Sequence, residues 1–202
     1  MFTGIVTELG RVASVESTDF GRRLAVECAQ TRSRLGIGDS VSVNGVCLTV
    51  VALSERGFTV EAVAETLQRS NLGGVDVGDP LDLERPMAAD GRFDGHLVQG
   101  HVDGVGSILS IESEGTARRI RIGAPLPLSQ YLVEKGSVTV DGVSLTITAV
   151  APPGAGDVWF EVVIIPHTLD VTVFGARTIG DEVNLEVDVI AKYVERMLEA
   201  HR

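Results

Sequence analysis

The sequence predicts an all-β protein made of two homologous antiparallel domains in tandem, each a small barrel or sandwich, followed by a short C-terminal α-helix. The first observation is a repeat: residues 40–53 (SVSVNGVCLTVVAL) align with residues 137–150 (SVTVDGVSLTITAV). The second is that both copies consist of short segments rich in Val, Ile, Thr and Leu, separated by Gly, Asn-Gly or Asp-Gly turns. Such segments are typical of strands and hairpins. A repeat of about 100 residues is too long for a solenoid unit, so each copy matches one small domain.

The composition indicates a packed, acidic, globular protein. Of 202 residues, 44% are hydrophobic, which excludes intrinsic disorder, and 17 Lys and Arg against 28 Asp and Glu give a net charge of −11. Nucleic acids and anionic membranes are therefore not expected as partners, because both carry the same sign of charge. We see no secretory leader and no apolar stretch of about 20 residues, so we expect a cytoplasmic protein. Cys28 and Cys47 alone cannot form a disulfide framework or a four-cysteine zinc site.

The repeat continues on both sides of its central block. Residues 2–16 align with residues 98–112 at an offset of 96, and residues 58–84 align with residues 160–186 at an offset of 102. The offset grows because the second copy is longer at residues 151–159, which is typical of an insertion at a hairpin tip. We expect about six strands in each copy, in a small antiparallel barrel or sandwich, and closure into a barrel would leave no strand edge exposed.

The boundary between the copies falls in a stretch rich in turn formers, PMAADGRFDG. We expect an N-terminal barrel over residues 1–97, a C-terminal barrel over residues 98–189 and a helix over residues 190–202. Apolar residues at helical spacing predict this helix: Ile190, Val194, Met197 and Leu198. A helix of about eleven residues is marginal alone in water, so it should pack on its own barrel or on another subunit.

Each copy places two small polar side chains on one face of an otherwise apolar strand. They are Cys47 and Thr49 in the first copy, and Ser144 and Thr146 in the second. The pairs indicate a ligand pocket in each domain, although a solvent-facing polar stripe fits the same pattern. For Cys47 taken alone, the pattern favours a small core residue.

Two equivalent strand ends carry further polar residues. Glu65 and Thr66 follow one predicted strand, and His167 and Thr168 follow its counterpart. Loop ends commonly carry binding groups, and a helix-capping threonine is the alternative.

Other polar residues distinguish the two copies. Asp188 follows the last repeated strand and aligns with Pro86, so the two copies are not equivalent. His96 and His101, five residues apart, would face opposite sides of a strand, with no cysteine or carboxylate nearby to complete a ligand set. We therefore expect ordinary hydrogen-bonded histidines and no metal site.

Several sequence blocks, spread in order over nearly the whole chain, form a recognisable pattern. They are MFTGIV at residues 1–6, SVNGVCLTV at 42–50, AETLQRSNLG at 64–73, GHLVQGHVDGVG at 95–106, KGSVTVDGVSLT at 135–146 and IPHTL at 165–169. Together with the ending VNLEVDVIAKYVERML at 183–198, these blocks closely resemble the riboflavin synthase alpha-chain family.

The resemblance implies a fold, a reaction and partners. The fold is two six-stranded Greek-key barrels, each binding one 6,7-dimethyl-8-ribityllumazine, in a homotrimer held partly by C-terminal helices. The active site forms between the N-terminal barrel of one subunit and the C-terminal barrel of another. The reaction transfers a four-carbon unit between two lumazines and yields riboflavin and 5-amino-6-ribitylaminouracil, with no metal or redox cofactor. Association with lumazine synthase is a further implied partnership.

The resemblance also implies site residues, carried over by motif position. The N-terminal pocket would be lined by Gly4, Ile5, Val6, Ser40, Cys47, Leu48, Thr49, Glu61, Ala62, Val63, Ala64, Glu65 and Thr66, with Gly100, His101 and Val102 from the junction. The C-terminal pocket would be lined by Lys135, Ser144, Leu145, Thr146, Val163, Ile164, Ile165, Pro166, His167, Thr168 and Asp188.

Four of these residues are catalytic candidates, because a lumazine must lose a proton from its 7-methyl group while a nucleophile adds to its partner. Ser144 and Asp188 would assist on the C-terminal side, and Cys47 and His101, with Thr49, on the N-terminal side. Glu65, Thr66, His167 and Thr168 would read the ribityl hydroxyls.

Two alternatives share the expected fold. A non-catalytic lumazine- or flavin-binding protein would depart from the family in the C-terminal pocket, where Lys135, Ser144, Thr146 and Asp188 are all present. The flavin-binding barrel of a reductase would need a nicotinamide domain, which the 202 residues do not supply. One local departure from the family is Val171-Thr172-Val173-Phe174, which puts the polar contacts near that turn in doubt.

Overall fold

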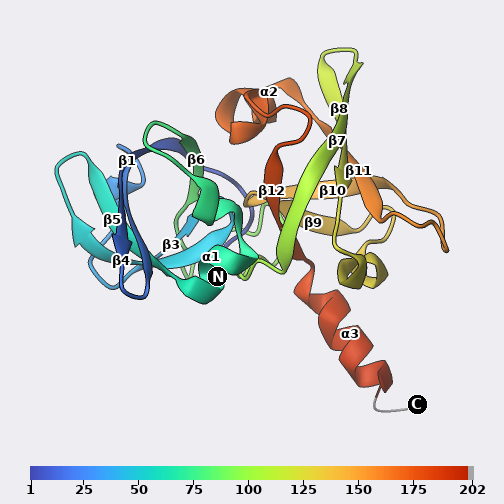
Figure 1. The fold of residues 1–202 in the computed structure, drawn as a ribbon, viewed down its shortest axis with the longest axis horizontal. Coiled ribbons are helices and arrows are strands. Elements are labelled where there is room, and N and C mark those ends of the chain that lie inside the picture. The colour runs from blue at the N-terminus through green and yellow to red at the C-terminus, as the bar shows by residue number, and fades with distance from the viewer. Residues whose placement is uncertain (200–202) are drawn as a thin grey trace.

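The computed structural model describes residues 1–199 and contains two closed six-stranded antiparallel barrels and a C-terminal helix (Figure 1). The first barrel has the strand order β1-β2-β5-β4-β3-β6, and the second repeats it as β7-β8-β11-β10-β9-β12. The neighbours β2–β5 and β1–β6 are not consecutive in sequence, which is the Greek-key arrangement. The predicted all-β fold with two tandem barrels and a C-terminal helix is confirmed.

The strands of the first barrel are β1 (Glu8–Thr18), β2 (Gly21–Glu27), β3 (Ser40–Val43), β4 (Val46–Leu53), β5 (Gly57–Val63) and β6 (Pro80–Glu84). Those of the second are β7 (Gly104–Glu114), β8 (Ala117–Gly123), β9 (Ser137–Val140), β10 (Val143–Val150), β11 (Trp159–Ile164) and β12 (Glu182–Val187). The helices are α1 (Ala64–Arg69), α2 (Pro166–Val171) and α3 (Val189–Glu199), with short 3-10 turns η1 (Arg32–Arg34), η2 (Asn71–Gly74), η3 (Leu126–Tyr131) and η4 (Val173–Gly175).

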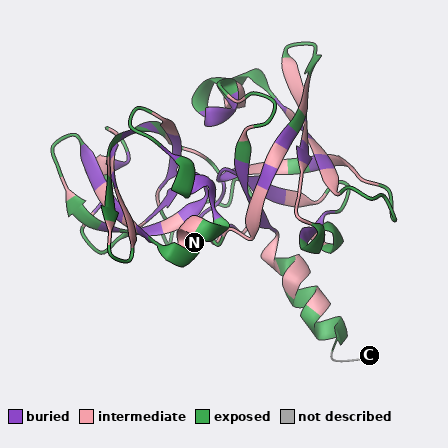
Figure 2. Ribbon diagram, in the orientation of Figure 1, coloured by how far each residue is buried: buried purple, intermediate pink, exposed green. Residues whose placement is uncertain are grey.

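Each barrel closes around its own apolar core, because alternate residues of the strands point inward. Leu24 of β2 and Phe58 of β5 are fully buried in the first barrel, as are Ile120 of β8 and Phe160 of β11 in the second. Buried positions recur along the strands of both barrels (Figure 2). The longer stretch of the second copy forms the tip between β10 and β11, which pair antiparallel, as expected of a hairpin insertion.

The β3–β4 and β9–β10 hairpins turn at the predicted Asn-Gly and Asp-Gly pairs. Asn44 and Gly45 have φ of 46° and 77°, and Asp141 and Gly142 have φ of 46° and 88°. Two successive positive φ values match the backbone twist of the flanking strands and suit Asn, Asp and Gly better than other residues.

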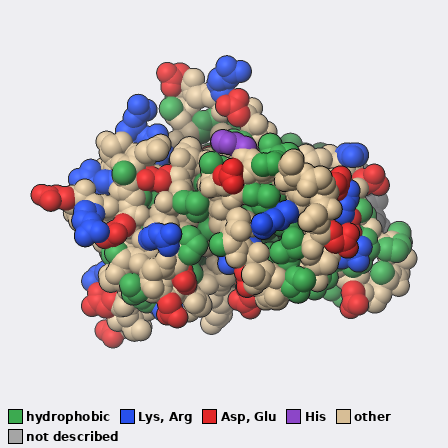
Figure 3. Space-filling view, turned by 90° about the horizontal axis from the view of Figure 1, so that it is seen from above, with side chains coloured by type: hydrophobic (Ala, Val, Ile, Leu, Met, Phe, Trp, Pro, Cys, Tyr) green, Lys and Arg blue, Asp and Glu red, His purple; other side chains and the backbone are tan. Residues whose placement is uncertain are grey.

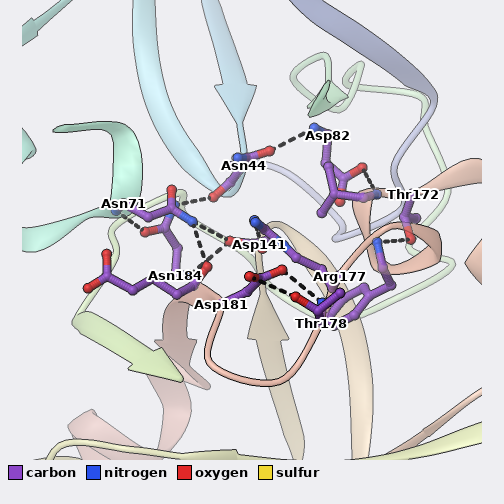
Figure 4. A network of polar contacts seen from close by, with 12 residues as sticks. Asn44, Asn71, Asp82, Asp141, Thr172, Arg177, Thr178, Asp181 and Asn184 are labelled. Atoms are coloured by element: carbon purple, nitrogen blue, oxygen red, sulfur yellow. Dashed lines mark hydrogen bonds and ion pairs between the residues drawn. The ribbon is translucent and has the colours of Figure 1, made fainter. Parts of the chain in front are cut away.

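These two turn tips meet where the barrels join. A Cβ on Gly45 would lie 2.6 Å from the backbone nitrogen of Gly142, so only glycine allows the approach. Around the tips lies a buried polar cluster from both barrels, which we call the joint (Figure 4). The joint consists of Asn44, Asn71, Asp82, Asp141, Arg177 and Asn184.

A second contact between the barrels is an exchange of chain segments. Residues 2–6, which lead into β1, and residues 98–102, which lead into β7, pass one another antiparallel at a bridge between Phe2 and Val98. Phe2 N donates to Val98 O at 2.7 Å, and Val98 N donates to Phe2 O at 3.2 Å. We call these two stretches the crossing segments. Both bridge residues are buried, so the start of the chain is fixed in the junction between the barrels.

Helix α3 projects away from the barrels (Figure 1), and none of its residues is buried (Figure 2). The expected helix over residues 190–202 thus begins at Val189, and residues 200–202 lie outside the described residues. Over residues 1–199, no helix is long and apolar enough to cross a bilayer.

Candidate functional site

The paired polar side chains lie on the outer faces of the barrels. Val46, Leu48 and Val50 of β4 point into the core, so Cys47 and Thr49 point outward, the thiol half-buried and the hydroxyl exposed. In β10, Ser144 is likewise half-buried and Thr146 exposed. The alternative that Cys47 is a core residue is therefore wrong.

Each half-buried residue is covered by a crossing segment that belongs to the opposite barrel. The backbone nitrogen of Ser144 donates to the carbonyl of Gly4 at 2.8 Å, and that of Cys47 donates to the carbonyl of Gly100 at 2.9 Å. Gly4 and Gly100 have φ of 76° and 77°, and a Cβ on either would lie 2.6 Å from the Cβ of the residue it covers. Glycine is required at both positions by conformation and by space.

This exchange corrects the expected place of Gly4, Ile5 and Val6, which we had assigned to the N-terminal pocket. Gly4 covers β10, and Val6 packs against the core of the second barrel. Val102, the counterpart of Val6, packs against the core of the first barrel.

We call the outer face of β4 with residues 100–102 the N-site, and the outer face of β10 with residues 4–6 the C-site. Ser40 lies opposite Thr49 across the β3–β4 pair, so it extends the polar face of the N-site. The side chains of Leu48, Ala62 and Ile164 lie in the barrel cores, so these expected site residues can offer a ligand only backbone groups.

Two buried glutamates that the sequence reading did not select hold the crossing segments. Glu84 accepts the backbone N–H of Thr3 at 2.7 Å and that of Gly4 at 2.9 Å, one on each carboxylate oxygen. Glu186 accepts those of Gln99 and Gly100 at 2.7 and 2.9 Å. Burial raises the pKa of both carboxyls, and these hydrogen bonds partly offset it. The aligned Leu-Glu pairs at the ends of β6 and β12 were the signal for them.

His96 lies against the C-site and contacts two hydroxyls. Its Nδ1 lies 2.7 Å from Ser144 Oγ, and its Nε2 lies 3.2 Å from Oγ1 of Thr139, which is buried in β9. Burial lowers the pKa of the imidazole, and the negative charge of Asp188 raises it in part. The expectation of a hydrogen-bonded histidine is confirmed for His96, whereas His101 of the N-site is exposed.

Asp188 also has a structural partner. Its Oδ1 accepts the backbone N–H of Ile190 at 2.9 Å, at the start of α3. The base of this helix is held by the ion pair of Lys192 with Asp103 at 2.6 Å and by a hydrogen bond from Tyr131 to Glu195. Asp188 thus links the C-site to the C-terminal helix.

Lys135 lies in a strained conformation beside the C-site. Its φ is 65°, whereas its counterpart in the first barrel is Gly38, with φ of 91°. Its backbone nitrogen donates to Ile147 O at 2.8 Å, next to Thr146. A lysine held where glycine is favoured indicates that the side chain serves a purpose other than stability.

The polar residues at the two strand ends lie at the short helices α1 and α2. Val63 and Ile165 occupy the N-cap positions, so the alternative of Thr66 and Thr168 as helix caps is wrong. The carbonyl oxygens of these threonines instead accept the hydroxyls of Ser70 and Thr172, both at 2.6 Å.

Neither the charged surface nor a large cavity marks the C-site. On the face seen in Figure 3, acidic and basic side chains are interspersed over both barrels. A cavity of about 1050 Å³ lies on the outside of the second barrel, where Arg121 stacks 4.2 Å from the ring of Trp159. Neither Ser144 nor Thr146 lines it.

The comparisons with known proteins agree with the duplication of the chain. The model of the lumazine binding domain family matches residues 3–86 and again residues 99–188. Riboflavin synthase of Mycobacterium tuberculosis (strain ATCC 25618 / H37Rv) is 46% identical over 201 residues, 99% of each chain. That of Bacillus subtilis (strain 168) is 41% identical over 198 residues, 98% of this chain and 90% of the relative. The chain belongs to the riboflavin synthase family.

Solved structures show the same fold at lower identity. LumP complexed with 6,7-dimethyl-8-(1'-D-ribityl) lumazine has a TM-score of 0.82 and 21% identity, covering 93% of this chain and 99% of that chain. LumP complexed with riboflavin has a TM-score of 0.81 and 22% identity over the same shares. The family model and the relatives confirm the resemblance seen in the sequence blocks, and the solved structures confirm the double-barrel fold.

In this member of the riboflavin synthase family, residues 171–174, which depart from the family pattern, lie between α2 and the joint. Thr172 Oγ1 accepts the backbone N–H of Phe174 at 3.4 Å and donates to Thr168 O, and Val173 N donates to Asp82 Oδ1 at 2.9 Å. The departing residues thus connect α2 to the joint rather than to the outer face of β10.

Proposed function

We propose that this chain is a riboflavin synthase that converts two molecules of 6,7-dimethyl-8-ribityllumazine into riboflavin and 5-amino-6-(ribitylamino)uracil. The observation that carries the proposal is a pair of matched outer-face sites, each completed by a glycine of the opposite barrel. A reaction between two identical molecules needs two related sites, and relatives named riboflavin synthase match along the whole length.

The two sites support opposite roles because their polar groups differ. The N-site offers the Cys47 thiol, the Thr49 hydroxyl and His101, and the C-site offers the Ser144 hydroxyl with Asp188 nearby. One lumazine gives up a proton from its 7-methyl group while a nucleophile adds to the ring of the other. Holding both rings in the correct orientation supplies a large part of the acceleration.

The remaining expected residues form the surroundings of the two rings. Backbone groups beside Leu48, Ala62 and Ile164 would read the pyrimidine edges, since their side chains are in the cores. Polar groups at the strand ends, with Lys135, would bind the ribityl chains. These polar groups are Glu61, Glu65, Thr66, His167 and Thr168.

We also propose that the protein acts as a homotrimer through α3. Tyr193, Val194 and Leu198 are 66%, 50% and 59% exposed on a helix whose base is fixed to the second barrel. An exposed apolar stripe of this kind is expected to be covered by other copies. We expect Val194→Asp to convert trimers into monomers in light scattering coupled to size exclusion. A monomeric wild type at micromolar concentration would contradict the proposal.

The enzyme that makes the lumazine is a candidate partner, to be tested by co-sedimentation of the two purified proteins. The unpaired Cys28 and Cys47 support a reducing compartment such as the cytoplasm.

The function is tested by incubating the purified protein with 6,7-dimethyl-8-ribityllumazine and no added cofactor. We expect riboflavin, followed by its absorbance and fluorescence, with one pyrimidine product released for each flavin formed. Tight binding of lumazine without riboflavin formation would contradict the proposal and would leave a lumazine-binding protein without catalysis.

A further inference from the structure

Asp103, the residue directly after the crossing segment of the N-site, binds both the last strand of the second barrel and the C-terminal helix. Its backbone nitrogen donates to the carbonyl of Leu185 at 2.8 Å. One carboxylate oxygen accepts the backbone N–H of Val187 at 2.9 Å, and the other accepts from Lys192 Nζ at 2.6 Å. The side chains of Asp103 and Lys192 are 19% and 29% exposed, so water screens this ion pair only in part. Asp103 therefore connects the end of the crossing segment to β12 and to α3.

Two carboxylates fix the backbone that completes the N-site. Glu186 holds its beginning, because it accepts the backbone N–H groups of residues 99 and 100 at 2.7 and 2.9 Å. Asp103 holds its end through β12 and α3. His101 and Val102, which belong to the N-site, lie between these two anchors. Their position thus depends on whether both anchors are formed.

In the first barrel, the equivalent position holds a different kind of residue. The counterpart of Asp103, at the offset of 96, is Thr7, whose backbone nitrogen donates to Leu83 O at 2.9 Å in the same way. Its hydroxyl donates to the same carbonyl at 3.2 Å, so this side chain binds within the first barrel. Within the described chain, β6 is followed by a linker without a helix, whereas β12 leads directly into α3. An acid thus occupies this position in the barrel that carries the helix.

We propose that Asp103 is a positioning residue that couples the N-site to α3, so that the covering of α3 by other copies fixes the backbone beside Cys47. This inference rests on the proposed function, namely on lumazine binding at the N-site and on the trimer. Asp103 itself touches no ligand in this proposal. It acts through residues 100–102, which complete the N-site.

The order of α3 decides whether this ion pair is formed. A helix of 11 residues is marginal in water, and α3 is held to the second barrel through Lys192 and Glu195. Other copies that cover its exposed apolar side chains keep the helix ordered, and the pair with it. When the helix frays, Asp103 is left as a largely buried carboxylate without its cation, which costs free energy. The carboxylate then turns toward solvent and releases the N–H of Val187, so the crossing segment loses one anchor.

The coupling is tested first by lumazine affinity, at a protein concentration where light scattering shows trimers. Lys192→Met keeps the apolar stem and removes the cation, and we expect it to weaken the binding of 6,7-dimethyl-8-ribityllumazine by about tenfold. Lys192→Arg keeps the charge and should restore the affinity to within about twofold of the wild type. The matched control is Arg196→Met, which removes an exposed cation of the same helix that pairs with Glu199 at 3.0 Å, and it should leave the affinity unchanged.

A second readout needs neither substrate nor activity. The chain has 4 histidines, and the ring of His101 lies between the two anchors of the crossing segment. We expect the NMR signals of this ring to shift in Lys192→Met and to stay in place in Lys192→Arg and Arg196→Met. The ring of His167, at α2 of the second barrel, serves as the internal reference.

A double-variant cycle separates this coupling from the loss of the trimer itself. Val194→Asp uncovers α3, so the Lys192–Asp103 pair should already be weakened in that background. Adding Lys192→Met should then reduce lumazine affinity by less than about twofold more, because effects that act through one shared contact do not add. A further tenfold loss in the double variant would overturn the proposal.

Two further results would contradict the proposal. One is a trimeric Lys192→Met protein with wild-type lumazine affinity and an unshifted His101 ring. The other is an equal loss of affinity in Lys192→Met and Arg196→Met, which would assign the effect to the helix as a whole and not to its pair with Asp103. If the wild type makes no riboflavin, the proposed function fails, while lumazine affinity and the His101 signal still decide the coupling. Light scattering of the wild type decides the trimer separately.

Discussion

Asp82 Oδ1 accepts the backbone N–H of Val173 at 2.9 Å, which joins the last strand of the first barrel to the second barrel. The equivalent residue, Asn184, accepts the backbone N–H of Asn71 at 2.7 Å in the reverse direction (Figure 4). The amide nitrogen of the same side chain, Asn184 Nδ2, donates to the carbonyl of Asn44 at 2.8 Å. An acid therefore occupies in one barrel the place of an amide in the other.

The geometry indicates that Asp82 is protonated in the folded protein. Its Oδ2 is buried and has no hydrogen-bond partner among the described residues, which suits a protonated carboxyl. Burial raises the pKa of Asp82 well above its usual range, the charge of Asp141 raises it further, and Arg177 offsets this only in part. Arg177 binds Asp141 at 2.6 Å, so the cation of the joint is paired with Asp141 rather than with Asp82.

A first prediction is that Asp82→Asn stabilises the protein, and more so at pH 8 than at pH 5. A raised pKa means that the folded state binds more protons than the unfolded state above about pH 4, so the contribution of Asp82 to stability falls as pH rises. The amide keeps the hydrogen bonds and carries no charge. Urea unfolding at both pH values measures the free energy of unfolding of the variant and of the wild type. The contributions of the other buried acids are common to both proteins and cancel in the difference. Equal pH slopes for both proteins would show that Asp82 is ionised when folded, and the exposed Asp94→Asn is the control.

The fold could be predicted from the sequence because a barrel of short strands depends on local signals. The Asn44-Gly45 and Asp141-Gly142 turns and the apolar alternation each act within a few residues, and the repeat doubles every signal. Cys47 and Ser144 were found for the same reason, as polar residues that break an apolar pattern. The exchange of the crossing segments depends instead on contacts across about 140 residues, such as Gly4 with Ser144, which no local pattern contains.

The contacts of His96 could not be predicted for a related reason. The sequence predicted a hydrogen-bonded histidine, but its partners Ser144 and Thr139 are 48 and 43 residues away. Asp82 likewise resembles any surface aspartate in the sequence, because its burial follows from how the two turn tips pack together.

A second prediction concerns the close approach of Gly4 to Ser144, which the approach of Gly100 to Cys47 repeats in the other barrel. We expect Gly4→Ala to cost about 1 kcal/mol for its positive φ and a further 1–3 kcal/mol for the contact with Ser144. The matched control is Gly78→Ala, at φ of 96° with open space around it, which should show the first cost alone. Urea unfolding compares the two variants. Equal losses would mean that the crossing segment moves away from Ser144 without penalty.

A third prediction concerns the glutamates that hold the crossing segments. Glu84→Gln leaves one oxygen for two backbone donors, so an N–H of Thr3 or Gly4 faces an amide NH2 group, at an expected cost of about 1–3 kcal/mol. We expect riboflavin formation to fall with it, since Gly4 positions Ser144. Glu186→Gln should act in the same way on the N-site, and the exposed Glu55→Gln should leave stability and rate unchanged. If both buried variants formed riboflavin at the wild-type rate, the position of the crossing segments would not matter for the reaction, and the prediction would be wrong.

A fourth prediction is that Lys135→Gly makes the protein slightly more stable and weakens its binding of lumazine. Glycine removes a left-handed strain of about 1 kcal/mol, partly offset by the greater freedom of glycine in the unfolded chain, so unfolding should need slightly more urea. The same variant should bind lumazine more weakly, because the ammonium group that we expect to bind the ribityl chain is lost. The reverse change in the first barrel, Gly38→Lys, provides the comparison: it adds the strain where no ligand contact is expected of the side chain. A Lys135→Gly protein that gains stability and keeps full lumazine affinity would leave the strain at this position without a functional reason.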